Sequence, residues 1–289
     1  MTVIRWRYKN IFILLAVVTS AYILVSLKHV IFHEGIMELI FGEDTEGPCN
    51  KRVRHLDDNL AKKWPIIGIL GPPGSGVVWL RYLIEQLTGI YTGSVDTEYG
   101  HLFIAEGQTK KVVAVMAHDI SVLPHMKAGI VLYRHMKDTV RSQYAAKHGP
   151  GAVLEAPMEA YYAGKEWEMF AMDQGKIWAE RYHDYIRYGK PLMIINYDDL
   201  SDPDQVKRQL LHISHFVHVP IRQSVLDCLV ERISDVDLHP DVKPQALRHG
   251  FNPFELLPVS KQQMLLKLEN YTEKMVIQTK EGFLPRIHV

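Results

Sequence analysis

A glycine-rich turn between an apolar run and a helix-forming segment constrains this chain more than any other feature. Residues 66–70 (IIGIL) are typical of a short buried strand, and the turn GPPGSG follows at residues 71–76. Residues 77–88 have the pattern of a helix that ends at Gly89. Backbone N–H groups at such a turn point toward a bound anion, and the helix dipole favours negative charge. The pattern therefore predicts a loop that binds phosphate.

The residues of this loop limit which nucleotide chemistry it can support. Gly74 and Gly76 let the backbone approach a phosphate closely, and the Ser75 hydroxyl adds a donor. The spacing is that of a nucleotide P-loop, which continues with Lys and then Ser or Thr for the phosphates and magnesium. Val77 and Val78 stand there instead. This argues against magnesium-dependent hydrolysis of ATP or GTP; a strand-to-helix turn without a ligand is the alternative to phosphate binding.

Apolar strands and helices alternate along the chain after Trp64, which predicts an α/β domain. We expect a P-loop-like three-layer fold with a central parallel sheet flanked by helices. The further strands are expected at residues 112–116, 130–133 and 192–197. The further helices are expected at residues 136–147, 166–188 (as one or two helices), 203–216, 224–233 and 260–280.

An uncharged apolar run near the N-terminus, residues 11–27 (IFILLAVVTSAYILVSL), predicts a membrane anchor. At about 1.5 Å per residue such a helix just spans a thin bilayer. Basic residues at positions 5, 7 and 9 place the short N-terminus in the cytosol by the positive-inside rule. A cleaved signal peptide is the alternative, but residues 28–30 (KHV) offer no small-x-small cleavage site. We therefore expect one transmembrane helix before the folded domain.

The expected organisation has four parts. Residues 1–10 form a cytosolic tail, 11–27 the anchor, 28–63 a lumenal stem and 64–289 the α/β domain. Much of the stem is charged and turn-rich, as in a linker. Asn270 begins the sequon Asn-Tyr-Thr, a candidate for N-glycosylation that agrees with a lumenal domain.

Composition narrows the classes of partner and of site. Lys plus Arg equals Asp plus Glu, with 33 of each among 289 residues, so no net charge attracts nucleic acid. Cys49 and Cys228 are too few for a disulfide scaffold and lack the spacing of a zinc site. One bridge between them in an oxidising lumen and two separate thiols are both open. The 15 histidines are scattered, and we expect no metal site.

A second candidate phosphate site follows the strand at residues 130–133. Arginine has a planar fork that matches a pair of phosphate oxygens. At the carboxyl end of its strand, Arg134 would face the crevice where open α/β sheets bind ligands. Ser142 lies two turns into the next helix and can reach the same phosphate. A surface salt bridge for Arg134 and an ordinary polar position for Ser142 are the alternatives.

Taken together, these motifs resemble those of sulfotransferases. Residues 72–94 (PPGSGVVWLRYLIEQLTGIYTGS) are similar to the family's 5′-phosphosulfate loop and first helix, and residues 131–144 (VLYRHMKDTVRSQY) to its 3′-phosphate motif. Within the superfamily, the chain resembles most the sulfotransferase domain of WSC-domain-containing proteins, which share the helix ending TGxYTGS. The likeness runs from Pro65 to the C-terminus. Further matching positions are Trp167, Phe170, Trp178, residues 187–200 and Pro203. The cysteine-rich WSC domain itself is absent from the sequence.

The resemblance implies an activity and a set of site residues. It implies sulfuryl transfer from 3′-phosphoadenosine 5′-phosphosulfate to a hydroxyl of a glycan on a lumenal glycoprotein or glycolipid, without a metal. It also implies a single-pass type II protein of the Golgi membrane. The residues it assigns are Gly74, Ser75, Gly76 and Arg81 on the 5′ side, Arg134 and Ser142 at the 3′-phosphate, and Arg248 with His249 in a closing loop.

The resemblance also points to a catalytic base. In sulfotransferases a strand that ends in Lys-Thr-His often supplies it, and the corresponding stretch here is VVAVMAHDI. His118 is therefore the expected base, since histidine titrates near neutral pH. A hydrogen-bonded loop histidine is the alternative for His118. The carboxylates of Asp96, Glu98 and Asp119 are the substitutes.

Three departures from the family pattern bear on activity. Gly74 stands where many sulfotransferases have Lys, Val77 and Val78 stand where Thr-Thr is usual, and Met116 replaces the Lys before the catalytic His. Loss of charge-stabilising donors costs orders of magnitude in rate. A catalytically inactive nucleotide-binding or scaffold protein of the secretory pathway is therefore the alternative, followed by a nucleoside kinase or NTPase.

Overall fold

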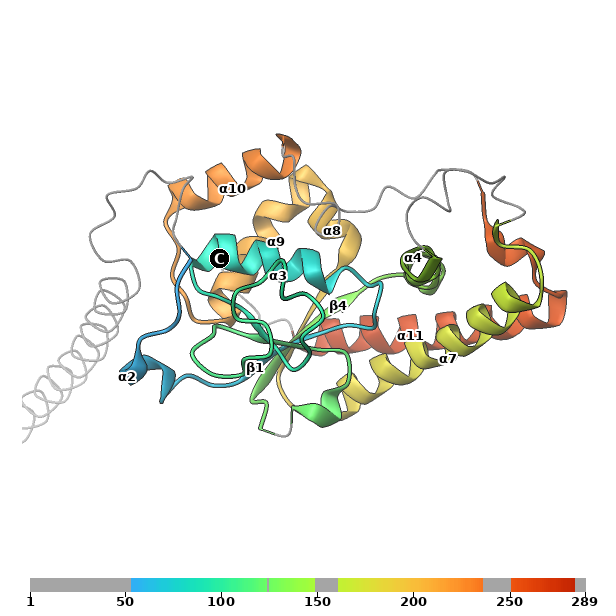
Figure 1. Ribbon diagram of the computed structural model, residues 1–289, viewed down its shortest axis with the longest axis horizontal. Helices are drawn as coiled ribbons and strands as arrows, with labels where there is room; N and C mark the ends of the chain where they lie inside the picture. Colours follow the sequence, from blue (N-terminus) through green and yellow to red (C-terminus); the bar gives the residue numbers. More distant parts are fainter. Residues whose placement is uncertain (1–52, 124, 149–160, 236–250, 284–289) are drawn as a thin grey trace, which may run out of the picture. The chain divides into compact units, whose positions relative to one another are not determined.

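The computed structural model describes residues 53–123, 125–148, 161–235 and 251–283 (Figure 1). The chain divides into two compact units, Met1–Gly47 and Pro48–Val289, and the described residues all belong to the second. The expected anchor at residues 11–27 lies outside them. Among the described residues, no helix has the length and apolar character needed to cross a membrane.

The centre of the second unit is a five-stranded parallel sheet with the strand order β2-β3-β1-β4-β5. The strands are short and almost entirely buried, as expected when helices cover both faces of a sheet. Their bounds are β1 Ile67–Leu70, β2 Gly93–Ser94, β3 Val115–Ala117, β4 Ala128–Tyr133 and β5 Leu192–Asn196. The predicted parallel sheet is confirmed.

Helices cover both faces of this sheet (Figure 1). Helices α3, α9 and α10 pack together on one side, while α7, α11 and α4 lie on the other. The helices are α2 Asp58–Ala61, α3 Val77–Thr88, α4 Met136–His148, α7 Lys165–Arg187, α8 Tyr197–Ser201, α9 Pro203–Phe216, α10 Gln223–Asp235 and α11 Val259–Phe283, with the 3₁₀ turns η1 Ile120–Val122 and η2 Pro253–Leu256. The three layers are those predicted.

Local signals located the helices well. The bounds of α3 and α9 agree with the prediction, and α3 ends at Gly89 in the left-handed region with φ 66°. The segment predicted as one or two helices at residues 166–188 is the single helix α7. The strand expected at residues 112–116 is β3 at Val115–Ala117, and the Val113 N–H ahead of it donates to the Tyr91 carbonyl.

The compact unit includes residues that the sequence assigns to the stem. Leu56 is buried, and its N–H donates to the Lys111 carbonyl. Arg54 forms a parallel bridge with Ile90. Residues 54–63 thus contact the domain ahead of the expected boundary at 64, because they supply hydrogen-bond partners to the segments around Ile90 and Lys111.

Cys228, in α10, is disulfide-bonded. Cys49 is the one other cysteine of the sequence, and it lies outside the described residues.

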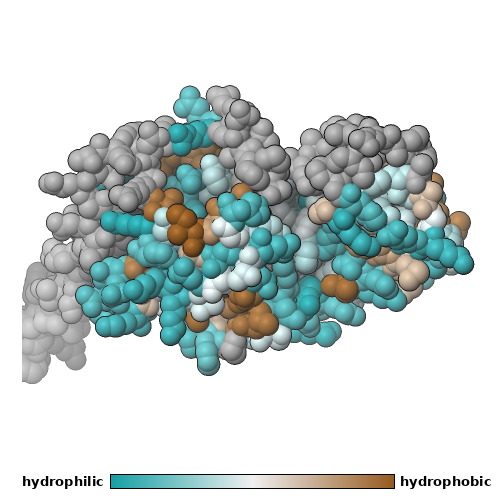
Figure 2. Space-filling view, viewed as in Figure 1, coloured by the Kyte–Doolittle hydropathy of each residue, from teal (hydrophilic) through white to brown (hydrophobic). Residues whose placement is uncertain are grey.

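Figure 2 shows one face of the molecule, where hydrophilic residues surround small groups of hydrophobic ones. Ile104 and Val122 are among the exposed apolar side chains of the domain. Single apolar side chains of this kind are normal on protein surfaces and need no partner.

Candidate functional site

The carboxyl ends of the five parallel strands lie at one edge of the sheet, where open α/β sheets bind ligands. Candidate residues from distant parts of the sequence meet there. The segments that leave this edge are residues 71–76 after β1, 95–98 after β2, 118–119 after β3, 134–135 after β4 and Tyr197 after β5.

The glycine-rich loop needs its glycines for its own conformation and packing. Gly74 has φ 78° and Gly76 has φ 94°, both in the left-handed region. A Cβ added at Gly74 would lie 2.6 Å from the Thr139 carbonyl oxygen of α4, and one at Gly76 would lie 2.5 Å from the Tyr197 ring. The loop thus packs closely between α4 and Tyr197, and a side chain at either glycine would displace the loop.

The loop also offers unsatisfied polar groups to an anion. Gly76 is the N-cap of α3 and makes no side-chain capping bond, so the first-turn amides of the helix have no intrahelical acceptor. The Ser75 side chain is buried, and its Oγ has no hydrogen-bond partner within the described part of the chain. A buried orphan hydroxyl costs free energy unless a partner is supplied. These groups fit the predicted phosphate loop.

Arg134 lies against this loop. Its Nη1 donates to the Gly74 carbonyl oxygen at 2.8 Å, and its guanidinium carbon lies 4.2 Å above the centre of the Tyr197 ring. Arg134 is 7% exposed, so little of this residue reaches solvent. Gln143 of α4 binds the same loop, through Nε2 to the Pro73 carbonyl oxygen at 2.7 Å. Recognition of a 3′-phosphate by Arg134 stays a prediction.

His118 contacts the other end of the loop. Its Nδ1 lies 2.7 Å from the Gly71 carbonyl oxygen, and its own carbonyl oxygen accepts a hydrogen bond from the Tyr185 hydroxyl at 2.7 Å. A carbonyl oxygen only accepts, so Nδ1 carries a proton, and in the neutral ring Nε2 has the lone pair. This tautomer is the one that a base acting through Nε2 requires.

The three substitute carboxylates differ in their surroundings. Asp119 binds Arg181 at 2.7 Å, and hydrogen bonds to Ser121 followed by the Arg181 contact hold its pKa below the usual range. Asp96 and Glu98 are exposed on the segment after β2. Asp119 is therefore engaged in structure, while Asp96 and Glu98 have free access to solvent.

The remaining residues assigned from the sequence lie in different surroundings. Ser142 is buried in α4, one residue before Gln143, and its role stays a prediction. Arg248 and His249 lie outside the described residues. Asn270 is exposed on α11, but Thr272 of the same sequon is buried and hydrogen-bonded to His183.

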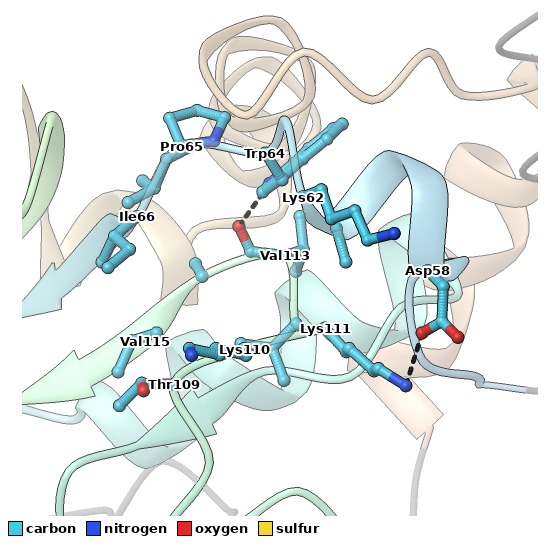
Figure 3. A pocket seen from close by; sticks show the side chains of 14 residues that line it. Asp58, Lys62, Trp64, Pro65, Ile66, Thr109, Lys110, Lys111, Val113 and Val115 are labelled. Carbon is cyan, nitrogen blue, oxygen red and sulfur yellow. Dashed lines mark hydrogen bonds and ion pairs between the residues drawn. The ribbon is translucent and has the colours of Figure 1, made fainter.

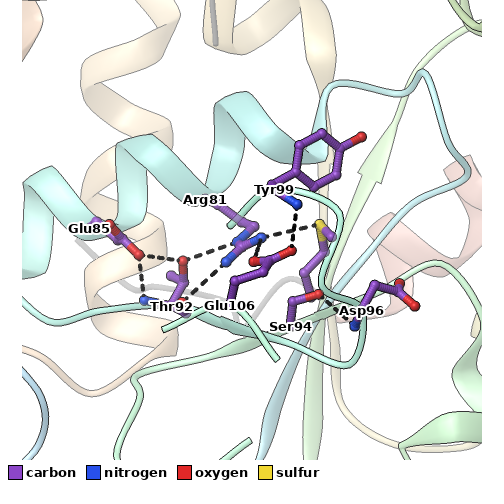
Figure 4. Close-up of polar contacts among 8 residues, drawn as sticks. Arg81, Glu85, Thr92, Ser94, Asp96, Tyr99 and Glu106 are labelled. Carbon is purple, nitrogen blue, oxygen red and sulfur yellow. Dashed lines mark hydrogen bonds and ion pairs between the residues drawn. The ribbon is translucent and has the colours of Figure 1, made fainter. Parts of the chain in front are cut away.

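The place of Arg81 differs from the one we expected (Figure 4). Its side chain is 0% exposed, and Nη1 lies 2.7 Å from a carboxylate oxygen of Glu106. Nε donates to the Thr92 hydroxyl at 3.2 Å, and the guanidinium carbon lies 3.8 Å above the Phe103 ring. Burial lowers the pKa of Arg81, against the opposing effect of Glu106. Arg81 is therefore an interior ion-pair residue, and this conformation gives a ligand no access to it.

The sequence did not indicate the partners of Arg81. Glu106 also accepts from the Tyr99 N–H at 3.1 Å, so one carboxylate joins α3 to the segment after β2. Glu85 accepts from the Thr92 N–H and hydroxyl, and burial raises its pKa. The segment that carries Tyr99 and Glu106 has no periodic pattern, and an isolated Glu gives no signal of burial.

Apart from Gly74, the residues that depart from the sulfotransferase pattern occupy core positions. Val77, Val78 and Met116 are all buried. The sulfur of Met116 lies 3.9 Å from Nη1 of Arg81, so this side chain points toward the interior ion pair. In this fold, position 116 therefore faces the core.

Two cavities lie at opposite edges of the sheet. The first has a volume of about 430 Å³ and lies at the amino ends of β1 and β3, next to the Asp58–Lys111 ion pair and Trp64 (Figure 3). The second, of about 330 Å³, lies at the candidate edge between α4 and α11 and is lined by His135, Arg141 and Glu269 among others. Of these two cavities, the second is lined by His135, the residue that follows Arg134.

The His135–Glu269 pair gives the second cavity a titratable group. His135 Nδ1 lies 3.7 Å from Oε1 of Glu269, which also accepts from the Met136 N–H at 2.9 Å. The nearby Glu269 carboxylate raises the pKa of His135. Within the described ranges, no group of three or more His, Cys, Asp or Glu side chains converges to hold a metal ion.

No protein-family model matches the chain, but comparison with known proteins finds relatives. The chain is 32% identical over 170 residues to WSCD family members of Drosophila pseudoobscura pseudoobscura and Drosophila melanogaster, and 31% identical to one of Aedes aegypti. Each match covers 55% of this chain and 52% of the relative, so the chain spans about half the length of the curated relatives it matches. A crystal structure of a mouse sulfotransferase complexed with PAP covers 84% of this chain and 94% of its own, with 13% identity and a TM-score of 0.49.

Proposed function

We propose that this chain transfers a sulfuryl group from 3′-phosphoadenosine 5′-phosphosulfate to a hydroxyl of an acceptor. The observation that carries the proposal is the meeting of His118 and Arg134 at one glycine-rich loop. His118 bonds to its first carbonyl, that of Gly71, and Arg134 to that of Gly74. A phosphate loop, a fork for a second phosphate and a base thus share one edge. The similarity to WSCD family members supports the motif resemblance that suggested this chemistry.

Each residue has a distinct part in the proposed reaction. The first-turn amides of α3, with Ser75, hold the negative charge of the 5′ side. Arg134 binds the 3′-phosphate through the N–H groups not used by Gly74. His118 accepts the proton of the acceptor hydroxyl at Nε2. When bound, the donor supplies the sulfuryl group, whose bond to the phosphate oxygen breaks as the acceptor oxygen bonds to sulfur.

The finer parts of the proposal rest on the sequence. We propose a glycan of a lumenal glycoprotein or glycolipid as the acceptor, and a Golgi type II membrane protein anchored by residues 11–27. The uncharged run after a basic N-terminus supports the anchor. The sequon that begins at the exposed Asn270 agrees with a lumenal domain, while the Thr272 hydroxyl of this sequon is bonded to His183.

A nucleotide-binding protein without turnover is the second candidate. Val77 and Val78 are buried and bring no hydroxyl to the loop, and Met116 points to the interior. This candidate shares the donor site and differs only in the chemical step, so binding and turnover must be measured separately.

Calorimetric titration of the full detergent-solubilised chain with adenosine 3′,5′-bisphosphate, without magnesium, tests the donor site. We expect binding that weakens at least about tenfold in Arg134→Gln, because a charged fork to phosphate is lost. Lys190→Gln is the control, since Lys190 is an exposed cation just before the amino end of β5. A folded wild type that does not bind contradicts the donor assignment, and binding that requires magnesium favours a nucleoside kinase or NTPase.

Turnover of labelled donor with mixed glycan acceptors then separates the two candidates. In His118→Gln we expect a loss of about 10²–10⁴ in rate with bisphosphate binding retained. A wild type that binds the bisphosphate and transfers nothing to any acceptor is the result expected of the inactive relative.

A further inference from the structure

One face of α7 contacts both segments that carry candidate functional residues. Trp178, Arg181, Tyr182 and Tyr185 lie within two turns of the helix, at the three- and four-residue spacings that place side chains on one side. Trp178, Tyr182 and Tyr185 are almost fully buried. Their polar atoms all bind backbone at the carboxyl edge of the sheet.

The second half of this face contacts the His118 segment. The Tyr185 hydroxyl donates to the His118 carbonyl oxygen at 2.7 Å, and Arg181 binds the carboxylate of Asp119, the next residue. Burial raises the pKa of the Tyr185 hydroxyl, which therefore stays a donor. His118 is held at its backbone by α7 and at its ring by the Gly71 carbonyl oxygen.

The first half of this face contacts the Arg134 segment in the same way. Trp178 Nε1 donates to the Arg134 carbonyl oxygen at 3.0 Å. The Tyr182 hydroxyl donates to the Leu132 carbonyl oxygen at 2.7 Å and accepts from the Arg134 N–H at 3.2 Å. Arg134 is therefore also held at its backbone by α7, while its guanidinium binds the Gly74 carbonyl.

We propose that Tyr185 is a positioning residue for the candidate base His118, and that Tyr182, one turn earlier, has the same role for Arg134. This inference rests on the proposed function and deepens it: α7 sets where the base and the phosphate-binding fork stand relative to the loop. The hydroxyls touch backbone only, so each acts through the residue it holds. Because they hold different residues, their removal affects different steps.

The two matched variants Tyr185→Phe and Tyr182→Phe, each in the full chain, test this assignment. We expect Tyr185→Phe to lower kcat about tenfold with the Kd for adenosine 3′,5′-bisphosphate within about twofold of wild type, since tenfold corresponds to one lost hydrogen bond. We expect Tyr182→Phe to raise that Kd about tenfold. Arg181→Gln changes a partly exposed position, so it should lower kcat less than Tyr185→Phe does and also leave the Kd unchanged.

Nitrogen NMR of the histidine rings adds a readout that does not depend on activity. The His118 signals, identified by their loss in His118→Gln, should show the Nδ1–H tautomer in wild type and in Tyr182→Phe. In Tyr185→Phe the other tautomer should gain population, because a displaced ring loses its bond to Gly71.

The outcomes separate the two proposals. Equal defects in kcat, Kd and ring tautomer for both tyrosine variants would show a general loss of stability and overturn the positioning roles. An unchanged His118 tautomer and kcat in Tyr185→Phe would overturn the role of that residue. A tautomer shift confined to Tyr185→Phe in a chain that neither binds the bisphosphate nor transfers sulfate would keep the positioning role and reject the proposed function.

Discussion

Two buried arginines of this domain have opposite relations to solvent and to their partners. Arg81 is 0% exposed, and its charge is matched by Glu106 within 2.7 Å. Arg134 is 7% exposed, and its guanidinium contacts a backbone carbonyl and an aromatic ring, both neutral. The interior arginine thus has its counter-charge within the protein. Among the residues that the structure describes, no carboxylate pairs with the edge arginine, which leaves its charge for an anion.

The difference teaches how to distinguish a structural arginine from a binding one. A guanidinium buried with a carboxylate is part of the fold, and loss of either partner leaves an uncompensated charge. A guanidinium held by neutral groups at the ligand edge is oriented but not neutralised. Removal of Arg81 should therefore affect stability, and removal of Arg134 should affect binding.

The largest expected effect is that of Arg81→Met on stability. Methionine fills a similar apolar volume but leaves Glu106 buried without its cation, which should lower the free energy of unfolding by about 3–5 kcal/mol. Chemical denaturation followed by circular dichroism measures this loss. In the double variant Arg81→Met with Glu106→Gln, at least about 1 kcal/mol should return, because no buried charge remains unpaired. A loss below about 1 kcal/mol in the single variant would contradict an interior role for the pair.

The second effect concerns the loop that Arg134 contacts. Gly74→Ala forces a side chain into the left-handed region at φ 78° and toward the Thr139 carbonyl oxygen at 2.6 Å. We expect a stability loss of about 1–3 kcal/mol and weaker bisphosphate binding, because the loop must move away from α4. Gly189→Ala, also at positive φ but with only the Arg187 carbonyl oxygen near the added Cβ, at 3.9 Å, is the control and should leave binding unchanged. Wild-type binding by Gly74→Ala would show that the loop is not the phosphate site.

The contrast between the two arginines also marks how far the sequence could predict the site. The turn at residues 71–76 and the cap Gly89 are local signals, so α3 was predicted with its bounds. That Arg134 follows a strand could be read from local pattern as well. The partner of Arg81 could not be predicted in this way. Glu106 lies 25 positions after Arg81, in an aperiodic segment, and nothing local shows that it is buried.

Other features were beyond sequence reasoning for related reasons. Strand β2 has two residues, too few for any alternation to be seen. The bonds from His118 and Arg134 to the loop carbonyls depend on side-chain direction, while the sequence predicted only that the strand ends share an edge. The tyrosines of α7 read as core residues, which they are, and their hydroxyl partners come from strands far away in the chain.

A third prediction examines the edge arginine directly. Arg134→Lys keeps the charge but loses the planar fork, so adenosine 3′,5′-bisphosphate should bind about tenfold more weakly, or about 1.4 kcal/mol. Stability should change by less than about 1 kcal/mol, since the lost bond to Gly74 is a single hydrogen bond. Isothermal titration with thermal melts measures both. Stability losses comparable to those of Arg81→Met would remove the contrast between the two sites.

The smallest expected effect concerns pH, and it arises at the edge. Glu269 raises the pKa of His135, so the pair contributes stability below the unfolded pKa of about 6.5 and loses it as pH rises through the folded pKa. The His135 side chain is 47% exposed, so screening keeps the contribution under about 1 kcal/mol. The free energy of unfolding should therefore fall slightly more from pH 6 to pH 8 in wild type than in His135→Gln, by urea denaturation at each pH. Glu269→Gln should flatten the profile similarly, because it removes the carboxylate that raises the pKa. A wild-type profile parallel to those of both variants would mean that the carboxyl edge of the sheet has no titrating pair of its own. The edge would then differ from the interior Arg81 site only in its exposure to solvent.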